Sequence, residues 1–216
     1  MQEHRLSTPR SARYFTLGAG TLAGASEVWI VCHGYGQLAS RFLERFRPLE
    51  ALGCCVVAPE GLSRFYLTES PTERRVGASW MTREDRLHEI DDYVRYLDAV
   101  HAHLKLPNAR TTALGFSQGS ATVCRWAALG TARIDRVIVW GGEVPPDLDL
   151  MQRQVVERLR AAHLTLVYGT RDAFFTPKIV AATEARLREH EIPYTLLPFE
   201  GAHEIHEPTL RTLGSS

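Results

Sequence analysis

Short apolar runs and amphipathic segments alternate along most of the chain. The apolar runs are rich in β-branched residues and have few polar positions, which is typical of strands covered on both faces. They occupy Glu27–Cys32, Cys54–Ala58, Thr111–Leu114, Arg136–Trp140, Leu164–Tyr168 and Tyr194–Phe199. Helix-compatible segments lie at Ser40–Leu52, Asp85–Lys105, Ser120–Leu129, Gln152–Ala162, Thr176–Glu189 and Ile205–Thr212. This alternation predicts a mostly parallel central sheet with helices on both faces.

Two parts of the chain depart from this alternation. Arg13–Leu17 is a short strand candidate, and the Gly-, Ala- and Ser-rich turn Gly18–Ser26 connects it to the strand at Glu27–Cys32. We therefore expect these two strands to form an antiparallel hairpin at the edge of the sheet. The segment Gly61–Arg86 shows no clear periodicity, and loops of this length in compact domains are often functional.

Aromatic side chains in this long loop could line a hydrophobic slot for a substrate. The candidates are Phe65, Tyr66 and Trp80, together with Phe174 and Phe175 near a later strand end. The alternative is that these aromatic residues pack the loops onto the body of the protein. The sequence leaves both interpretations open.

The run Thr111–Leu114 leads directly into Gly115-Phe116-Ser117-Gln118-Gly119, and a helix-compatible segment follows. A G-x-S-x-G sequence between a strand and a helix predicts a nucleophile elbow, in which the serine sits on a sharp turn. The flanking residues must be small because the strand and helix backbones nearly touch there. The helix also directs free N–H groups at the serine, where they favour a developing oxyanion. The alternative is an ordinary turn between a strand and a helix.

Two further residues complete a candidate catalytic triad with Ser117. Asp172 and His203 each follow a predicted strand, so all three side chains are expected at the carboxyl edge of the sheet. A neutral imidazole can take the proton of a serine hydroxyl, and a buried carboxylate orients that imidazole. Asp172 could instead be a turn or helix-capping residue, and His203 an ordinary loop histidine close to His206.

The segment His203-Glu204-Ile205-His206-Glu207 also invites a metal-binding interpretation. It lacks the H-E-x-x-H spacing that places two histidines on one face of a helix, and no separate cluster of ligands completes a site. We therefore expect neither a metal ion nor another cofactor.

Composition narrows the classes of function further. The chain has 25 Lys and Arg residues against 25 Asp and Glu residues, and this balance argues against binding to nucleic acid or to a membrane surface. No apolar segment approaches the length of a membrane span, and residues 1–15 lack the apolar core of a signal peptide. The 216 residues suit one domain, 1–216, which could be a monomer or a homodimer.

The four cysteines all fall in apolar segments: Cys32, Cys54, Cys55 and Cys124. Buried, reduced thiols are the expected state, which fits a cytoplasmic protein. None of them lies at the elbow, so a cysteine nucleophile has no support.

The motifs HGYGQ, GASW, GFSQG, GTRD and GAHEI, in this order, resemble the phospholipase/carboxylesterase family of small α/β-hydrolases. The resemblance covers nearly the whole chain and implies an α/β-hydrolase fold without a separate cap domain. It also implies that Ser117 is the nucleophile, Asp172 the acid and His203 the base. The chain departs from the family's thioesterase members at Tyr35, where they usually have leucine, and at Gln37, where they have aspartate.

The resemblance further implies an oxyanion hole formed by the backbone N–H groups of Tyr35 and Gln118. Gly34 and Gly36 let the turn at residues 33–37 approach a substrate oxygen closely. Its first residue, His33, is expected to orient this turn rather than to act as a base. The alternative is a strand-end turn with a structural histidine.

These observations predict a serine hydrolase that cleaves a small-molecule carboxylic ester or thioester through an acyl-enzyme on Ser117. Two alternatives use the same triad, namely an acyltransferase that passes the acyl group to an alcohol or amine, and a peptidase. A third alternative is a binding protein with this fold and negligible turnover.

Overall fold

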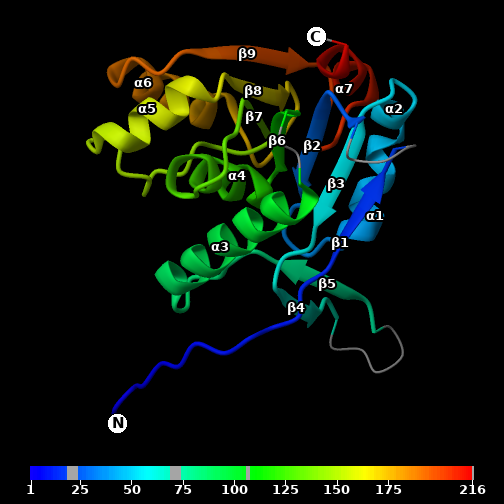
Figure 1. Cartoon of the computed structure of the whole chain (residues 1–216). Helices are drawn as coiled ribbons and strands as arrows, with labels where there is room; N and C mark the ends of the chain where they lie inside the picture. Colours follow the sequence, from blue (N-terminus) through cyan, green and yellow to red (C-terminus); the bar gives the residue numbers. More distant parts are fainter. Residues whose placement is uncertain (19–23, 69–73, 106–107, 216) are drawn as a thin grey trace.

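The structure is a computed structural model that describes residues 1–18, 24–68, 74–105 and 108–215. A seven-stranded sheet in the order β1-β3-β2-β6-β7-β8-β9 forms its centre (Figure 1). The strands are β1 (Tyr14–Leu17), β2 (Glu27–Cys32), β3 (Cys55–Pro59), β6 (Arg110–Phe116), β7 (Arg136–Trp140), β8 (Leu164–Gly169) and β9 (Tyr194–Phe199). Only β1 runs antiparallel to its neighbour, so the predicted mostly parallel sheet is confirmed.

Helices cover both faces of this sheet. One face is covered by α1 (Ala39–Leu43), the 3₁₀ helix η2 (Glu44–Phe46), α2 (Arg47–Glu50) and α7 (Glu207–Gly214). The other face carries α3 (Arg86–Leu104), α4 (Gln118–Leu129), α5 (Arg153–Ala161) and α6 (Pro177–Glu189). The segment predicted as one helix at Ser40–Leu52 is divided into α1, η2 and α2. Pro48 stands at the start of α2, where its missing N–H is tolerated.

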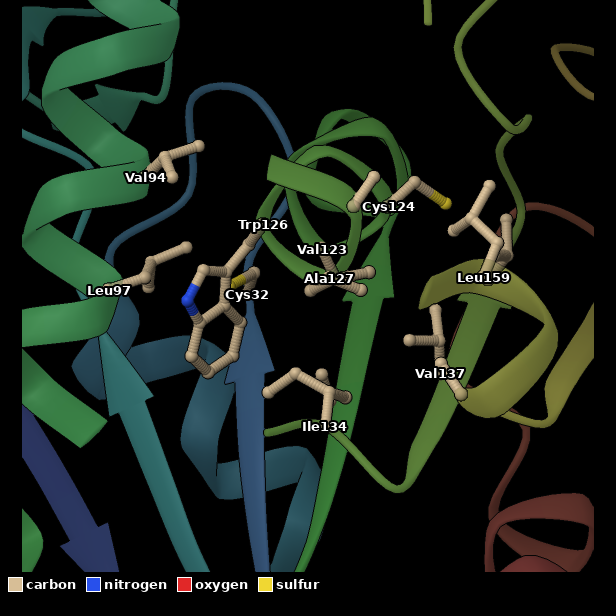
Figure 2. Close-up of a cluster of buried hydrophobic side chains, with 14 of the residues drawn as sticks. Cys32, Val94, Leu97, Val123, Cys124, Trp126, Ala127, Ile134, Val137 and Leu159 are labelled. Carbon is tan, nitrogen blue, oxygen red and sulfur yellow. The ribbon is translucent and has the colours of Figure 1, made fainter. Parts of the chain in front are cut away.

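Helix α4 lies at the centre of the larger core. Figure 2 shows Trp126, Val123 and Ala127 of this helix between Leu97 of α3 and Leu159 of α5, above the strands. Nine of the residues of α4 are buried, which is consistent with a helix that is covered on most sides. The central packing fixes the amino end of α4, and that end follows Ser117 directly.

The two cores explain why the strands are apolar at nearly every position. Along β2, Trp29 and Val31 belong to the core under α1 and α7, whereas Ile30 and Cys32 belong to the core under α3 and α4. Successive side chains of a strand point to opposite faces, so a sheet with two covered faces requires apolar residues in both sets.

The predicted pairing of the first two strands is wrong. Strand β1 pairs with β3, with Tyr14 opposite Pro59, because β2 already has β3 on one side and β6 on the other. Hydrogen bonds of Arg13, the residue before β1, hold the strand at this edge. Its guanidinium donates to the Glu60 carboxylate, and its carbonyl accepts from the Tyr96 hydroxyl and from the Glu60 N–H. The predicted turn at Gly18–Ser26 includes residues 19–23, which lie outside the described residues.

The long segment Gly61–Arg86 contains a two-stranded hairpin. Its strands are β4 (Ser63–Tyr66) and β5 (Val76–Ser79), and residues 69–73 between them lie outside the described residues. Strand β4 alternates half-buried and exposed positions, and β5 is made mostly of small residues, so neither has the apolar run by which the other strands are recognised. The hairpin lies at the carboxyl end of β3, beside the turn that follows β2 (Figure 1).

Candidate active site

Ser117 stands between β6 and α4 in a backbone conformation that non-glycine residues rarely adopt. Its φ and ψ angles are 55° and −117°. A residue held there stores on the order of 1–3 kcal/mol of strain and persists only where its surroundings enforce the conformation. The Ser117 N–H donates to the Trp140 carbonyl at 2.9 Å, and the Ser117 carbonyl accepts from the Ser120 N–H at 3.0 Å. The predicted strand, sharp turn and helix are therefore present with the serine at the apex.

Glycines on both sides of the serine allow the backbones to approach one another. A Cβ atom on Gly115 would collide with the carbonyl oxygen of Gly119. A Cβ atom on Gly119 would collide with the carbonyl of Cys32 and would lie 2.8 Å from that of His33. These obstacles are backbone atoms, which cannot rotate away, so only glycine fits at either position.

We expect Gly119→Ala to lower the free energy of unfolding by about 3 kcal/mol, because the added methyl group must displace backbone of β2 or of the turn that follows it. The measurement is urea denaturation followed by circular dichroism. Gly24→Ala is the matched control, since a Cβ atom there has nothing within 4 Å, and its effect should stay within about 0.5 kcal/mol. Equal midpoints for the two variants would contradict the packing described for the elbow.

Asp172 and His203 form a direct pair at the ends of β8 and β9. The Nδ1–H of His203 donates to Oδ2 of Asp172 at 2.7 Å. The other carboxylate oxygen, Oδ1, accepts from the backbone N–H groups of Phe174 at 2.8 Å and Phe175 at 2.9 Å. The buried carboxylate thus has three donors, which compensate for its removal from water.

Gly141 and Gly142, at the end of β7, lie between the elbow and the Asp172–His203 pair, and both are closely packed. A Cβ atom on Gly141 would lie 3.1 Å from Nδ1 of His203, and one on Gly142 would lie 2.7 Å from the carbonyl oxygen of Ser117. The ring of Phe116, the residue before the serine, lies 4.7 Å from the His203 ring. The structure therefore brings the predicted serine, histidine and acid to one end of the sheet.

His33 is fully buried at the start of the turn after β2. Its Nε2 accepts a hydrogen bond from the Gly61 N–H at 3.0 Å, so the ring proton resides on Nδ1, which donates to the Gly34 carbonyl at 2.8 Å. Burial lowers the pKa of His33 and keeps the ring neutral. Both ring nitrogens are occupied, and this agrees with a histidine that orients the turn.

The two predicted oxyanion donors lie in turns that leave their N–H groups available. In the fully described turn at residues 33–37, the N–H groups of Gly34, Gly36 and Gln37 have protein acceptors, whereas that of Tyr35 has none. Gln118 is the first residue of α4, where an N–H has no acceptor within its own helix. These turns follow β2 and β6, which are neighbouring parallel strands with Cys32 opposite Gly115.

The structure places the predicted substrate-contacting aromatics in three different environments. Trp80 is only 2% exposed, and its indole N–H donates to the His33 carbonyl at 2.8 Å, so it packs the loop and does not fit the predicted contact with substrate. Phe65 is half-buried, with its ring 5.1 Å from that of Tyr35, whereas Tyr66 is 62% exposed. Phe174 is 74% exposed, and its ring lies 4.9 Å from the His203 ring. Phe175, by contrast, is buried.

Other reactive groups have structural surroundings. The His206 ring stacks on Phe199, and its Nδ1 lies 2.8 Å from the Thr209 hydroxyl. Burial raises the pKa of the Cys124 thiol to about 12, which keeps it protonated. Within the described ranges, no group of three or more His, Cys, Asp or Glu residues is arranged to hold a metal ion. Among the helices that the structure describes, none has the length and apolarity to cross a membrane.

Some features of the site have no clear sequence signal. The side chains of Gln37 and Gln118 accept or donate hydrogen bonds that shape the two turns. The motifs HGYGQ and GFSQG mark these two positions, but they do not indicate which groups the side-chain amides contact. The position of the paired glycines after β7 against Ser117 and His203 depends on the register of the sheet.

The mostly parallel sheet, the strained serine at a strand-to-helix turn and the histidine–carboxylate pair at the same edge define a protein of the α/β-hydrolase class. A model of the family described as "alpha/beta hydrolase fold" matches residues 24–197. The chain therefore belongs to the alpha/beta hydrolase fold family. No curated protein matches the chain.

Solved structures with the same fold include three named for their activity on esters or thioesters. A carboxylesterase from Mesorhizobium loti is 18% identical, with a TM-score of 0.73 over 98% of this chain and 96% of that one. Acyl-protein thioesterase 2 from Zea mays is 14% identical, with a TM-score of 0.72 over 95% and 97%. Esterase PE8 is 20% identical, with a TM-score of 0.68 over 95% and 97%. At least 95% of this chain is shared with each, as expected for the fold without a separate cap domain.

Proposed function

We propose that this protein is a serine hydrolase that cleaves carboxylic esters or thioesters. The observation that carries the proposal is the joint placement of a strained Ser117 and the Asp172–His203 pair at one edge of the sheet. A strained serine at this turn is not sufficient evidence of catalysis, because a binding protein with the same fold can retain it. A serine at the same edge of the sheet as a histidine that is hydrogen-bonded to a buried carboxylate supplies the groups that nucleophilic catalysis needs.

The proposed reaction proceeds through an acyl-enzyme. Oγ of Ser117 attacks the acyl carbonyl while Nε2 of His203 takes the hydroxyl proton. The resulting oxyanion receives hydrogen bonds from the N–H groups of Tyr35 and Gln118. His203 then returns the proton to the leaving alcohol or thiol. A water molecule deprotonated by His203 attacks the acyl-enzyme, and collapse of the second tetrahedral intermediate releases the acid and restores Ser117.

The substrate class follows from the surroundings of the site and from the relatives by fold. The similar structures are named as a carboxylesterase, an acyl-protein thioesterase and an esterase, which supports an acyl substrate. The exposed ring of Phe174, next to the His203 ring, and the exposed Tyr35 in the turn after β2 offer apolar surface to a small ester. The proposed reaction needs no cofactor. The four cysteines are free, and all but the half-buried Cys55 are buried, which suits a reducing cytoplasm.

The experiment that tests this proposal is hydrolysis of p-nitrophenyl esters from acetate to dodecanoate, combined with a fluorophosphonate probe. We expect turnover of at least part of the series and one covalent phosphonyl adduct, which mass spectrometry places on the peptide that contains Ser117. The dependence on chain length measures the acyl surface. A folded protein that hydrolyses none of these esters and does not react with the probe would contradict the proposal and favour a binding protein.

A further inference from the structure

We propose that the side chain of Gln118 is a positioning residue, which sets the spacing of the two oxyanion donors by tying α4 to β5. This inference rests on the proposed function, because it assigns the oxyanion role to the N–H groups of Tyr35 and Gln118. It concerns the amide side chain of Gln118, which contacts no reacting atom.

The side-chain amide of Gln118 makes all its hydrogen bonds with one short segment, residues 79–81, at the end of β5. Its Oε1 accepts from the Trp80 N–H at 3.1 Å, and its Nε2 donates to the Met81 carbonyl at 2.8 Å and to the Ser79 hydroxyl at 3.2 Å. An acceptor and two donors are therefore all used. Ser79 and Trp80 are both buried, so the partners of Gln118 would lose hydrogen bonds that water could not readily replace.

The same hairpin strand is joined to the other oxyanion turn. The Gly36 N–H donates to the Ala78 carbonyl at 2.9 Å, and the Ala78 N–H donates to the Gln37 carbonyl at 3.1 Å. Gly77 lies so close to Gly36 that a Cβ atom on it would collide with the Gly36 carbonyl. Tyr35 is the residue immediately before Gly36, so β5 holds the turn that carries the Tyr35 N–H.

Strand β5 thus adds hydrogen bonds to both turns, which also pack directly against each other where Gly119 meets the His33 carbonyl. The sheet fixes the ends of β2 and β6, but the turns extend beyond the last paired residues of these strands, Cys32 and Phe116. Preorganised donors stabilise an oxyanion only at the correct distance, and a displacement of about 1 Å can cost about 10²-fold in rate. The side-chain amide of Gln118 therefore connects the residue that carries one proposed oxyanion donor to β5. Strand β5 in turn holds the turn that carries the other donor, the Tyr35 N–H.

A glutamine that merely stabilised the fold would have a different signature from one that positions the donors. Loss of general stability lowers the amount of active enzyme and leaves kcat, corrected for the active fraction, unchanged. Misplaced oxyanion donors lower kcat with little change in KM, because the interaction strengthens in the transition state. They also weaken binding of an alkyl boronic acid, which adds to the serine oxygen and places a boron-bound oxygen where the oxyanion forms.

The test compares Gln118→Leu and Gln118→Glu with the wild-type enzyme by kcat, KM and boronic acid inhibition, with active sites titrated by fluorophosphonate. Leucine removes all the amide contacts, whereas glutamate keeps an acceptor for Trp80 and loses the amide donor to Met81. We expect kcat to fall about 10- to 100-fold in Gln118→Leu, with KM within about twofold and boronic acid affinity reduced by the same factor as kcat/KM. Gln118→Glu should show a smaller loss of the same kind.

Gln154→Leu is the matched control, because Gln154 is exposed on α5, and it should keep wild-type kinetics. Variants that retain kcat within about twofold, or that lose it without weaker boronic acid binding, would overturn the positioning role. In that outcome, a wild-type enzyme that hydrolyses esters and an inactive Ser117→Ala variant would leave the proposed function standing. A wild-type protein without esterase activity would overturn both.

Discussion

Replacing Ser117 with alanine is expected to lower kcat/KM for ester hydrolysis by about 10⁴- to 10⁶-fold. Alanine removes the only atom of this residue that can bond to the acyl carbon, while Asp172 and His203 keep their hydrogen bond. The oxyanion donors are backbone N–H groups and remain in the variant, so a small residual rate over water should persist. The measurement is p-nitrophenyl ester hydrolysis at enzyme concentrations high enough to detect that residual rate.

The appropriate control is Ser11→Ala, which makes the same change at an exposed serine remote in sequence from the elbow. It should retain full activity and full reaction with the fluorophosphonate probe. Circular dichroism should show that Ser117→Ala keeps the native fold. A Ser117→Ala enzyme with more than about one hundredth of the wild-type kcat/KM would assign the nucleophile to another residue.

Replacing Asp172 with asparagine is expected to lower kcat by about 10⁴-fold, because the histidine would be held in the wrong tautomer. The backbone N–H groups of Phe174 and Phe175 both donate to Oδ1 of Asp172. An asparagine must keep its oxygen toward these two donors, so its NH₂ group would face Nδ1 of His203. That nitrogen would then have to accept, the proton would move to Nε2, and Nε2 could no longer take the proton of Ser117.

The measurement is kcat across pH 6 to 9, with Asp92→Asn as the control at an exposed carboxylate on α3. The control variant should behave as the wild type at every pH. Retention of more than about one tenth of kcat in Asp172→Asn would show that the Asp172–His203 pair does not act as proposed. A loss caused by unfolding is recognised by thermal denaturation, and an unchanged melting temperature assigns the loss to the tautomer.

The fold and the main chemical groups could be predicted because they depend on local patterns. Apolar runs that alternate with helical segments specify a parallel sheet, and a parallel sheet gathers its carboxyl ends at one edge. Ser117, Asp172 and His203 each follow such a run directly. Their placement therefore needed only the order of the elements, without any knowledge of side-chain contacts.

The features that the sequence did not reveal depend on partners distant in the chain. The role of Trp80 is decided by the His33 carbonyl, to which its indole donates. A tryptophan in an irregular loop has the same sequence signal whether it packs inward or faces a ligand. Likewise, the pairing of β1 with β3 depends on which edges of β2 remain free, and no local pattern contains that information.

All four tryptophans of the chain are buried, and this gives the protein a built-in optical reporter. The indole N–H of Trp80 donates to the turn after β2, and that of Trp140 donates to the Glu204 carbonyl, next to His203. Emission from the native state should thus lie at short wavelength, because the indoles are shielded from water. Movement of either loop would alter the environment of an indole directly, so fluorescence can follow the two sides of the site without an added label.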